Sequence, residues 1–475
     1  MLSIPRLVLS ATRGGLGKTT LAIGIIAAWR KRGRRVAVFK KGPDFIDAGW
    51  LGAAGGGLCY NLDLFLMERE RVLQSFQEHT GHADAAVIEG NRGLYDGMDS
   101  SGTYSTARLA QLLKTPVALI VDCTKSSATV GAVVLGCKIY DPAVDLRCVI
   151  LNNVSSARHE TVIRKAIEQS SGLPVVGAVP RLRPGEFPER HMGLTPYQEH
   201  SDVDGAIAAS AAAAEKFLDI DALWNIAYDA PPLEGLEEGL ENVFGQSGAQ
   251  GKTRERGELP TIGVIRDRAF QFYYPDNLEA LEEEGATLRE INALTDRALP
   301  EIDALYIGGG FPETQAAELA ANESFSRSIR GAAENGLPIY AECGGLIYLG
   351  RSLRVGDTTH VMTSVLPADF VLEKRPQAHG YTVLDVDGPN PFFDKGTALR
   401  GHEFHYSRIV NIAELPGAAF TMRRGAGIDG KADGLIYNNV LATYTHLHAL
   451  GAPEWARGLV KAAREYRKKA RQAVR

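Results

Sequence analysis

A glycine-rich segment near the N-terminus, Ala11-Thr-Arg-Gly-Gly-Leu-Gly-Lys-Thr-Thr20, has the residues for phosphate chemistry. It follows an apolar run and opens a helical pattern, which is the context that a phosphate-binding loop needs. In such a loop the backbone N–H groups turn inward on the phosphates, the lysine reaches the β- and γ-oxygens, and a threonine offers its hydroxyl to Mg²⁺. The predicted ATP-binding residues of this segment are Thr12, Arg13, Gly14, Gly15, Gly17, Lys18, Thr19 and Thr20.

Carboxylates follow two later apolar runs of the N-terminal half. Asp44 and Asp47 come just after Val36–Phe39, and Glu89 ends the run Ala85–Ile88. The carboxyl ends of neighbouring parallel strands meet at one crevice, so these side chains should meet the phosphate loop there. Each of them alone could equally be a helix cap or a turn residue. Hard oxygen ligands suit Mg²⁺ that bridges ATP phosphates. The predicted metal ligands are Thr19, Asp44 and Glu89.

A possible nucleophile, Cys343, lies in the segment Leu337-Pro-Ile-Tyr-Ala-Glu-Cys-Gly-Gly-Leu346. An apolar run ends there in two glycines, which predicts a sharp strand-to-helix turn that exposes a thiol and offers N–H groups to an oxyanion. A second glycine cluster, Gly308-Gly-Gly-Phe-Pro-Glu313, follows another apolar run and would form the facing wall. The predicted oxyanion-hole residues are Gly309, Gly310 and Gly344.

The Cys343 segment is similar to the nucleophile turn of glutamine amidotransferases. In that class the catalytic histidine lies near the end of the domain, and by this resemblance His446 is the expected base for Cys343. Enzymes of the class that use a triad carry a glutamate two residues after the histidine, but His448 stands at that position here. We therefore expect a Cys–His dyad without an orienting carboxylate. The other cysteines are expected to be buried and inert, namely Cys59, Cys123, Cys137 and Cys148.

The elements that must position these residues alternate along the chain. In the first half, apolar runs alternate with helical segments such as Leu21–Arg30, a rhythm that predicts a parallel sheet covered on both faces. The runs are Leu7–Leu9, Val36–Phe39, Ala85–Ile88, Val117–Val121, Val149–Leu151 and Val175–Val179. A second α/β series begins at Thr261–Ile265. The predicted fold class is therefore α/β, with an N-terminal phosphate-loop domain on a parallel sheet and a C-terminal domain like class I glutamine amidotransferases.

The chain has 475 residues, more than one hydrophobic core usually organises, so two domains are expected. The segment 231–260 is rich in Gly, Glu and Gln and reads as a linker. The predicted boundaries are 1–230 for an ATP-dependent amidoligase domain, 231–260 for the linker, 261–450 for the glutamine amidotransferase domain and 451–475 for a basic helix or tail.

Bulk composition points to small-molecule chemistry. A formal net charge of −5 argues against binding of nucleic acid through phosphate neutralisation. The sequence offers no apolar stretch long enough to span a membrane. Five scattered cysteines without zinc spacing fit a reducing compartment. We expect a cytoplasmic enzyme that neither binds nucleic acid nor enters a membrane.

Together these segments resemble the cobyrinic acid a,c-diamide synthase family, from about residue 5 to residue 450. The matching segments are Lys41-Gly-Pro-Asp-Phe-Ile-Asp47, Glu89-Gly90, Gly93-Leu-Tyr-Asp-Gly97, Pro188-Glu-Arg-His-Met-Gly-Leu194, the Cys343 turn and Gly401-His-Glu-Phe-His-Tyr-Ser407. Thr12 stands where a first glycine is usual, and this variant resembles the deviant loop of the partitioning-ATPase and dethiobiotin-synthetase superfamily.

The resemblance implies an activity and further site residues. The family uses ATP and Mg²⁺ to activate two acetate carboxylates of a corrin ring, as acyl phosphates, and amidates each with ammonia from glutamine. It implies that Asn152 reads adenine and that the chain forms a homodimer. The residues expected to contact the tetrapyrrole are Asp47, Arg92, Asp96, Arg190 and His191.

Three alternatives remain open from the sequence. Asn91-Arg92 replaces the Val-Met expected in a corrin enzyme and resembles amidases of sirohydrochlorin, its nickel complex or siroheme. A cobyric acid synthase would amidate other carboxylates of the same ring. A partitioning-type ATPase, which Arg13 suggests, would have no need of Cys343 and His446.

Overall fold

The computed structural model describes residues 3–181, 189–190, 193–233, 259–412 and 417–473. The chain divides into two compact units, Met1–Glu237 and Glu238–Arg475. Each unit has its own sheet and its own buried apolar core. The two units are therefore described one at a time.

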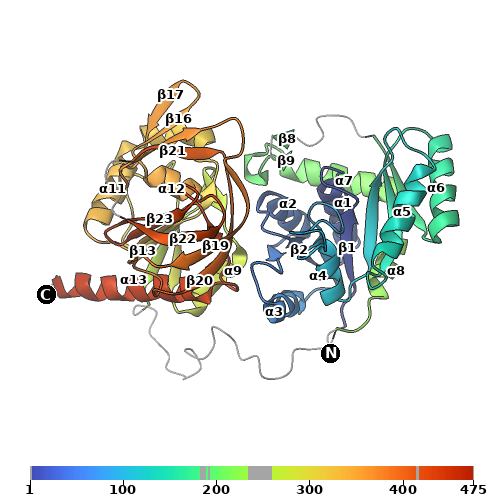
Figure 1. The fold of residues 1–475 in the computed structure, drawn as a ribbon, viewed down its shortest axis with the longest axis horizontal. Helices are drawn as coiled ribbons and strands as arrows, with labels where there is room; N and C mark the ends of the chain where they lie inside the picture. The colour runs from blue at the N-terminus through green and yellow to red at the C-terminus, as the bar shows by residue number, and fades with distance from the viewer. Residues whose placement is uncertain (1–2, 182–188, 191–192, 234–258, 413–416, 474–475) are drawn as a thin grey trace. The chain divides into compact units, whose positions relative to one another are not determined.

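The first unit is built on seven parallel strands in the order β3-β2-β4-β1-β5-β6-β7 (Figure 1). These strands are β1 (Arg6–Ala11), β2 (Val36–Lys41), β3 (Cys59–Leu62), β4 (Ala85–Glu89), β5 (Val117–Asp122), β6 (Leu146–Val154) and β7 (Val175–Pro180). The helices are α1 (Lys18–Lys31), α2 (Ile46–Gly55), α3 (Arg69–Thr80), α4 (Thr106–Leu112), α5 (Thr129–Tyr140), α6 (Ala157–Ser171), α7 (Val203–Phe217) and α8 (Ile220–Tyr228). A short antiparallel pair, β8 (Glu189–Arg190) and β9 (Gly193–Leu194), follows β7.

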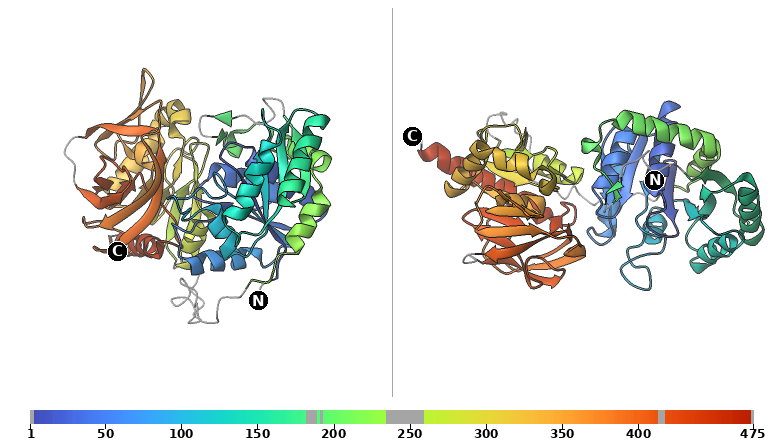
Figure 2. Two further views of the ribbon diagram at one scale, coloured as in Figure 1. Left: turned by 45° about the vertical axis from the view of Figure 1, so that its right-hand side comes forward. Right: turned by 90° about the horizontal axis from the view of Figure 1, so that it is seen from above.

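Helices cover both faces of this sheet, as expected for parallel strands that are buried along most of their length. Every residue of β1 and β4 is buried. The apolar sides of α1, α2, α7 and α8 pack on one face. Helices α3, α4, α5 and α6 lie on the other face (Figures 1 and 2). The sheet is thus a firm support for the loops at its carboxyl edge.

The predicted strand and helix rhythm of the first unit is confirmed, with one addition. The six apolar runs became β1, β2, β4, β5, β6 and β7. Strand β3 was not predicted, because Cys59–Leu62 is short and carries the polar Asn61. Asn61 is buried, and its side-chain amide is satisfied because it donates to the carbonyls of Gly42 and Asp44. The polar residue therefore holds the loop that follows β2.

The second unit contains a ten-stranded mixed sheet in the order β12-β10-β13-β15-β24-β23-β22-β19-β20-β25. The strands of this unit are β10 (Thr261–Ile265), β11 (Phe270–Phe272), β12 (Thr287–Ile291), β13 (Ala304–Ile307), β14 (Gly309–Gly310), β15 (Ile339–Glu342), β16 (Ser352–Val355), β17 (Thr358–Val361), β18 (Ala368–Leu372), β19 (Ala378–Val386), β20 (Ala398–His405), β21 (Ser407–Ile412), β22 (Ala418–Arg424), β23 (Ala432–Tyr437), β24 (Val440–Thr443) and β25 (His446–Leu447). Its helices are α9 (Pro275–Glu283), α10 (Ala316–Ala321), α11 (Glu323–Glu334), α12 (Gly344–Leu349) and α13 (Pro453–Ala473).

The large sheet changes direction along its width. Strands β12, β10, β13, β15 and β24 are parallel, and the strands from β24 to β25 pair antiparallel. Helices α9 and α13 pack on one face, and α10, α11 and α12 pack on the other. Strands β17, β16, β18 and β21 form a separate sheet, and β11 pairs with β14. The predicted α/β class is confirmed, and the antiparallel half of the sheet is an addition to it.

Helix α13 contains the basic segment expected at the end of the chain and, before it, residues that belong to the core. Its first half buries Trp455, Leu459 and Val460 in the core of the second unit. Basic residues dominate only its second half, where Lys468, Lys469 and Arg471 are exposed. None of the helices in the described part of the chain has both the length and the apolar character needed to cross a membrane.

Candidate functional site

The phosphate loop joins the end of β1 to the start of α1. Gly15 and Gly17 have φ angles of 69° and 75°, values that glycine adopts without strain. Lys18, the first residue of α1, is buried, and its Nζ donates to the carbonyl of Arg92 at 2.9 Å. Burial lowers the pKa of Lys18, and the nearby ammonium of Lys40 acts in the same direction. Lys18 thus joins the phosphate loop to the loop after β4.

The carboxylate predicted as a metal ligand lies beside the predicted threonine. Thr19 Oγ1 donates to Glu89 Oε1 at 2.8 Å, and both groups lie at the carboxyl edge of the sheet. Lys40, at the end of the neighbouring strand β2, donates to the same Glu89 oxygen at 3.0 Å and to Asp47 Oδ2 at 2.7 Å. The structure therefore brings Thr19, Glu89 and Asp47 together as predicted, around a lysine that the sequence analysis did not single out.

Negative charge exceeds positive charge in this cluster. Burial alone would lower the pKa of Lys40, but the carboxylates of Asp47, Glu89 and Asp44 together raise it. Burial raises the pKa of Glu89 to about 7 against the opposing effect of Lys40. Two ammonium groups, those of Lys40 and Lys18, therefore face the three carboxylates of Asp47, Glu89 and Asp44, and a further cation would be stabilised there.

An unpartnered oxygen supports a magnesium ion at this place. Glu89 Oε2 is buried and has no hydrogen-bond partner among the described residues. A buried carboxylate oxygen in that state costs free energy unless a cation or a donor reaches it. The donor set of a carboxylate and a threonine hydroxyl suits Mg²⁺, which takes only one or two protein carboxylates and fills its remaining positions with phosphates and water. Thr19 and Glu89 could thus hold the ion.

Asp44 has a further contact that bears on its predicted role. Its Oδ1 accepts a hydrogen bond from the backbone N–H of Asp47 at 2.8 Å, at the start of α2. Burial raises its pKa to about 6, and the neighbouring Asp47 carboxylate acts in the same direction. No group of three or more His, Cys, Asp or Glu side chains in the described ranges could by itself hold a metal ion. Asp44 as a magnesium ligand stays a prediction.

Two further residues predicted to bind nucleotide lie beside the phosphate loop. Asn152, in β6, donates through its side-chain amide to the carbonyl of Leu16 at 2.9 Å. Arg13 is exposed and reaches Asp122 Oδ2 at 3.1 Å. The amide N–H₂ of Asn152 is thus already used to brace the loop, and reading of adenine by this residue stays a prediction.

The residues predicted to contact the macrocycle are only partly placed. Arg92 is exposed and has a φ angle of 53°, which is unusual for a residue with a side chain. Asp96 Oδ2 accepts from the backbone N–H of Gly93 at 2.8 Å and closes the same loop. Arg190 lies in β8 by its backbone, whereas its side chain and all of His191 fall outside the described residues.

Cys343 forms the sharp turn that the sequence predicted. It follows β15 and caps α12 with φ 46° and ψ −95°, a strained conformation for a residue with a Cβ. Its N–H donates to the carbonyl of Thr443 at 2.7 Å, which joins the turn to the end of β24. Burial raises the pKa of its thiol, and the Glu313 and Glu342 carboxylates act in the same direction. The thiol therefore needs a base to become a thiolate.

The expectation that no carboxylate accompanies His446 is wrong. Glu342 Oε2 lies 3.1 Å from His446 Nδ1, and both side chains are almost fully buried. The carboxylate comes from the residue just before the nucleophile and not from a position after the histidine. His448, which stands at the usual position, instead lies 3.4 Å from Asp276 Oδ2. Spacing around the histidine gives no indication of a carboxylate that comes from before the nucleophile.

The predicted oxyanion-hole glycines lie together. Gly309 and Gly310 form β14, and a Cβ on Gly344 would lie 3.0 Å from the backbone nitrogen of Gly310. A Cβ on Gly309 would lie 2.4 Å from His446 Cε1, a distance that no side chain can accept. Glycine is therefore required at Gly309 for His446 to occupy its place beside this segment.

Comparison with known proteins identifies the same two kinds of domain. Residues 7–194 match the family model of the CobQ/CobB/MinD/ParA nucleotide binding domain, and residues 261–454 match that of the CobB/CobQ-like glutamine amidotransferase domain. A protein of Archaeoglobus fulgidus named cobyrinate a,c-diamide synthase is 41% identical, over 97% of this chain and 98% of that protein. The protein of that name from Magnetococcus marinus is 40% identical, over 97% and 98%. The chain belongs to the cobyrinate a,c-diamide synthase family. The predicted ligase that takes nitrogen from glutamine is thereby confirmed.

Lys40 and Glu342 were not predicted as site residues, although each lies next to a segment that was singled out. Lys40 directly follows the apolar run Val36–Phe39 and precedes Lys41, so the two lysines were interpreted as the start of a loop. Glu342 is the last residue of β15 and read as part of the strand before Cys343. A charged residue at the buried carboxyl end of a parallel strand is the signal that could have indicated both.

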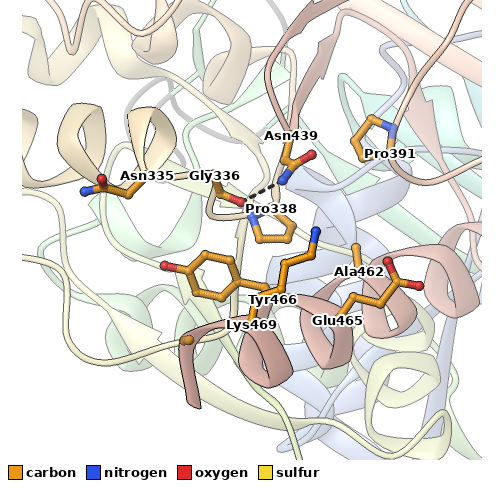
Figure 3. Close-up of a pocket in the computed structure, with 10 residues that line it drawn as sticks. Asn335, Gly336, Pro338, Pro391, Asn439, Ala462, Glu465, Tyr466 and Lys469 are labelled. Atoms are coloured by element: carbon orange, nitrogen blue, oxygen red, sulfur yellow. Dashed lines mark hydrogen bonds between the residues drawn. The ribbon is translucent and has the colours of Figure 1, made fainter. Parts of the chain in front are cut away.

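A surface cavity of about 490 Å³ lies in the second unit. It is lined by residues of α13, among them Glu465, Tyr466 and Lys469, and by Gly336 and Pro338 of the segment before β15 (Figure 3). Gly336 and Pro338 precede β15, whereas Cys343 follows it, so the cavity is at the opposite end of that strand. It contributes nothing to the glutaminase site.

Proposed function

We propose that this chain catalyses the ATP- and glutamine-dependent amidation of the a- and c-acetate carboxylates of cobyrinate, a step of cobalamin biosynthesis. One observation carries the proposal: a phosphate loop whose Thr19 meets Glu89 occurs in the same chain as a strained Cys343 that is directly preceded by Glu342, whose carboxylate pairs with the buried His446. Cobyrinate is the substrate after which the relatives that match almost the whole chain are named.

The N-terminal unit would activate the carboxylate. A carboxylate is a poor electrophile, so we propose transfer of the γ-phosphoryl group of ATP to it, giving an acyl phosphate and ADP. Mg²⁺, when bound, would neutralise charge on the phosphates. Lys18 would stabilise negative charge at the β- and γ-oxygens, and Thr19 and Glu89 would hold the ion. Ammonia would then displace phosphate and leave the amide.

The C-terminal unit would supply that ammonia. Sγ of Cys343 attacks the side-chain amide carbon of glutamine while His446 accepts the thiol proton. The C–N bond then breaks, His446 returns the proton to the leaving nitrogen, and ammonia is released while a γ-glutamyl thioester remains on Cys343. Water hydrolyses the thioester to glutamate and frees Cys343. Backbone N–H groups near Gly310 and Gly344 would stabilise the oxyanion.

One residue pair makes a different macrocycle an alternative candidate for the substrate. Asn91 and Arg92 differ from the residues expected in a corrin enzyme, and Arg92 is exposed beside the phosphate loop. A guanidinium can grip a peripheral carboxylate in two parallel hydrogen bonds on any tetrapyrrole of this kind. Sirohydrochlorin, its nickel complex and siroheme are therefore the alternatives to test.

One experiment separates these substrates. Purified protein is incubated with ATP, Mg²⁺ and glutamine together with cobyrinate or one of the alternative macrocycles, and the products are analysed by mass spectrometry. Each amidation changes the mass by the difference between OH and NH₂. We expect two such changes with cobyrinate. Two changes with another macrocycle and none with cobyrinate would contradict the proposed substrate but keep the amidoligase.

The predicted homodimer and the cytoplasmic location belong to the same proposal. A dimer is what the resemblance to the superfamily of the phosphate loop implies. Sedimentation of the purified chain with and without ATP and Mg²⁺ tests it, and a monomer under both conditions would contradict it.

A further inference from the structure

We propose that Glu342 is a positioning residue of the glutaminase site, which holds His446 in the tautomer that can accept the proton of Cys343. This inference rests on the assignment of Cys343 and His446 as nucleophile and base. Glu342 would take the place of the glutamate that other triads carry two residues after the histidine, where this chain has His448. The chain would then use a triad in which nucleophile and carboxylate are consecutive residues.

The contact identifies which ring nitrogen carries the proton. Glu342 Oε2 lies 3.1 Å from Nδ1 of His446. An ionised carboxylate can only accept a hydrogen bond, so Nδ1 must be the protonated nitrogen. Nε2 is then the unprotonated nitrogen. This nitrogen faces the oxyanion segment, since a Cβ on Gly309 would lie 3.2 Å from it. Nε2 is thus the nitrogen that can take a proton from a thiol.

Glu342 is held firmly enough to orient a neighbour. It is 1% exposed. Oε1 accepts from the N–H of Leu447 at 3.2 Å and from the hydroxyl of Tyr340 at 3.2 Å, and Oε2 accepts from the hydroxyl of Tyr306 at 3.4 Å. The Leu447 contact ties the carboxylate to the strand that carries His446. A buried carboxylate with fixed donors is pre-organised in the way that a triad requires.

Charge complementarity supports the same role. His446 is the only basic side chain within ion-pair distance of Glu342 among the described ranges. When His446 accepts the thiol proton it becomes a cation, and the buried carboxylate would stabilise it at the moment when charge develops. If Glu342 only accepted hydrogen bonds from Tyr306 and Tyr340, a histidine next to its Oε2 would not be required. The arrangement therefore fits a role in the proton transfer.

The test compares two kinds of variant in the full-length protein. Glu342→Gln replaces the carboxylate by an isosteric amide that can donate to Nδ1, which favours the wrong tautomer. Glutamine hydrolysis is measured with ATP, Mg²⁺ and the macrocycle present, and ammonia replaces glutamine in a parallel assay. Tyr340→Phe is the matched control, because it removes a hydroxyl from Glu342 and leaves the carboxylate on His446. Glu342→Asp keeps a carboxylate and serves as a second variant if Glu342→Gln does not fold.

We expect kcat for glutamine hydrolysis to fall on the order of 10²–10⁴-fold in Glu342→Gln, as for loss of the corresponding carboxylate in other triads. The KM for glutamine should stay within about threefold, because substrate binding is not touched. Tyr340→Phe should keep kcat within about tenfold. Glu342→Asp should recover part of the loss. Ammonia-driven amidation should be unchanged in all three variants.

The tautomer gives an independent readout. In protein labelled with ¹⁵N-histidine, the His446 ring should give the NMR signals of the Nδ1–H form, assigned by their loss in His446→Gln. Folded Glu342→Gln should give the Nε2–H form. Wild-type kcat in Glu342→Gln, or an equal loss in Tyr340→Phe, would overturn the inference. A wild-type protein that amidates no macrocycle with ammonia would instead overturn the proposed function.

Discussion

Arg92 combines an exposed side chain with a backbone conformation that arginine rarely adopts. Its φ angle is 53°, and its carbonyl accepts the hydrogen bond of Lys18. A left-handed conformation costs a residue with a Cβ roughly 1 kcal/mol relative to glycine. The strain is accepted for one of two reasons. Either the backbone carbonyl alone is needed for Lys18, or the guanidinium is also needed for a substrate carboxylate.

Arg92→Gly separates the two reasons. Glycine keeps the backbone conformation and the carbonyl but removes the guanidinium. We expect the KM for the macrocycle to rise at least about tenfold, since one charge-assisted contact is lost. Thermal stability should be unchanged or higher. The measurements are steady-state kinetics with ammonia as nitrogen source and a thermal melt of the same preparation.

Lys114→Gly is the matched control for this substitution. Lys114 is also exposed and has a φ angle of 46°, but it precedes β5 and so lies at the opposite edge of the sheet. It should show the same stability effect and no change in KM. An Arg92→Gly enzyme with wild-type KM would mean that only the carbonyl matters, and Arg92 would leave the list of substrate contacts.

Individual residues also show where prediction from sequence stops. Lys18, Thr19, Glu89 and Cys343 were found because each is part of a pattern in which spacing along the chain sets the geometry. The partners of such residues come from other strands, and tertiary packing determines which side chains contact them. The Glu342–His446 contact spans 104 positions and no local spacing encodes it.

At the scale of elements, the strand order explains why the N-terminal site could be predicted. Strand β4 lies between β1 and β2 in a parallel sheet, so the ends of all three meet at one edge. Alternation of apolar runs and helices indicates such a sheet, and the crevice rule then places the loops. The antiparallel strands of the second unit lack that regularity. Their pairing is non-local and was not predicted from apolar runs.

Strand β20 offers a prediction about pH because it carries a buried histidine. His402 pairs in register with His446 of β25, and the two rings stack at 4.9 Å between centroids. Burial lowers the pKa of His402 well below 6.5, and the neighbouring imidazoles of His446, His379 and His448 act in the same direction. His402 is therefore neutral when the strand is folded.

Below about pH 6.5 the unfolded state takes up a proton at His402 that the folded state does not, so stability falls as the pH is lowered. The free energy of opening of β20 should decrease by up to about 1.4 kcal/mol per pH unit from this residue. His402→Gln should reduce that slope. Hydrogen exchange by mass spectrometry over β20 at pH 5 and pH 7, corrected for intrinsic rates, measures it.

The control for the pH prediction is His360→Gln, on β17 of the separate four-stranded sheet. It should leave the pH dependence of β20 exchange unchanged. An equal slope in wild type and His402→Gln would contradict the prediction and would mean that other groups govern the acid sensitivity of this strand.

At the scale of the whole molecule, each compact unit carries one complete set of candidate catalytic residues. Lys18, Thr19 and Glu89 lie in the first unit, and Cys343 and His446 lie in the second. Ammonia is mostly protonated at neutral pH and then unreactive, which explains why a source of ammonia is part of the same chain. The two reactions can therefore be removed one at a time.

Cys343→Ala should abolish amidation driven by glutamine and leave amidation driven by ammonia within about threefold of wild type, because only the nitrogen source is lost. Glu89→Gln should do the reverse. It should keep glutamine hydrolysis and lower amidation from either nitrogen source by at least about 10²-fold, through loss of a metal ligand. Product mass and glutamate release are measured on the same preparations. Cys137→Ala, at another free cysteine, should change neither reaction.

Cys343→Ala and Glu89→Gln together test the model of two separate sites more strictly than either variant alone. A misfolded protein would lose both reactions, so retention of one reaction in each variant excludes global unfolding as the cause. Loss of ammonia-driven amidation in Cys343→Ala would mean that the thiol also serves the synthetase, and two separate sites could not be maintained. Near wild-type ATP turnover in Glu89→Gln would mean that the buried Glu89 Oε2 does not hold the ion.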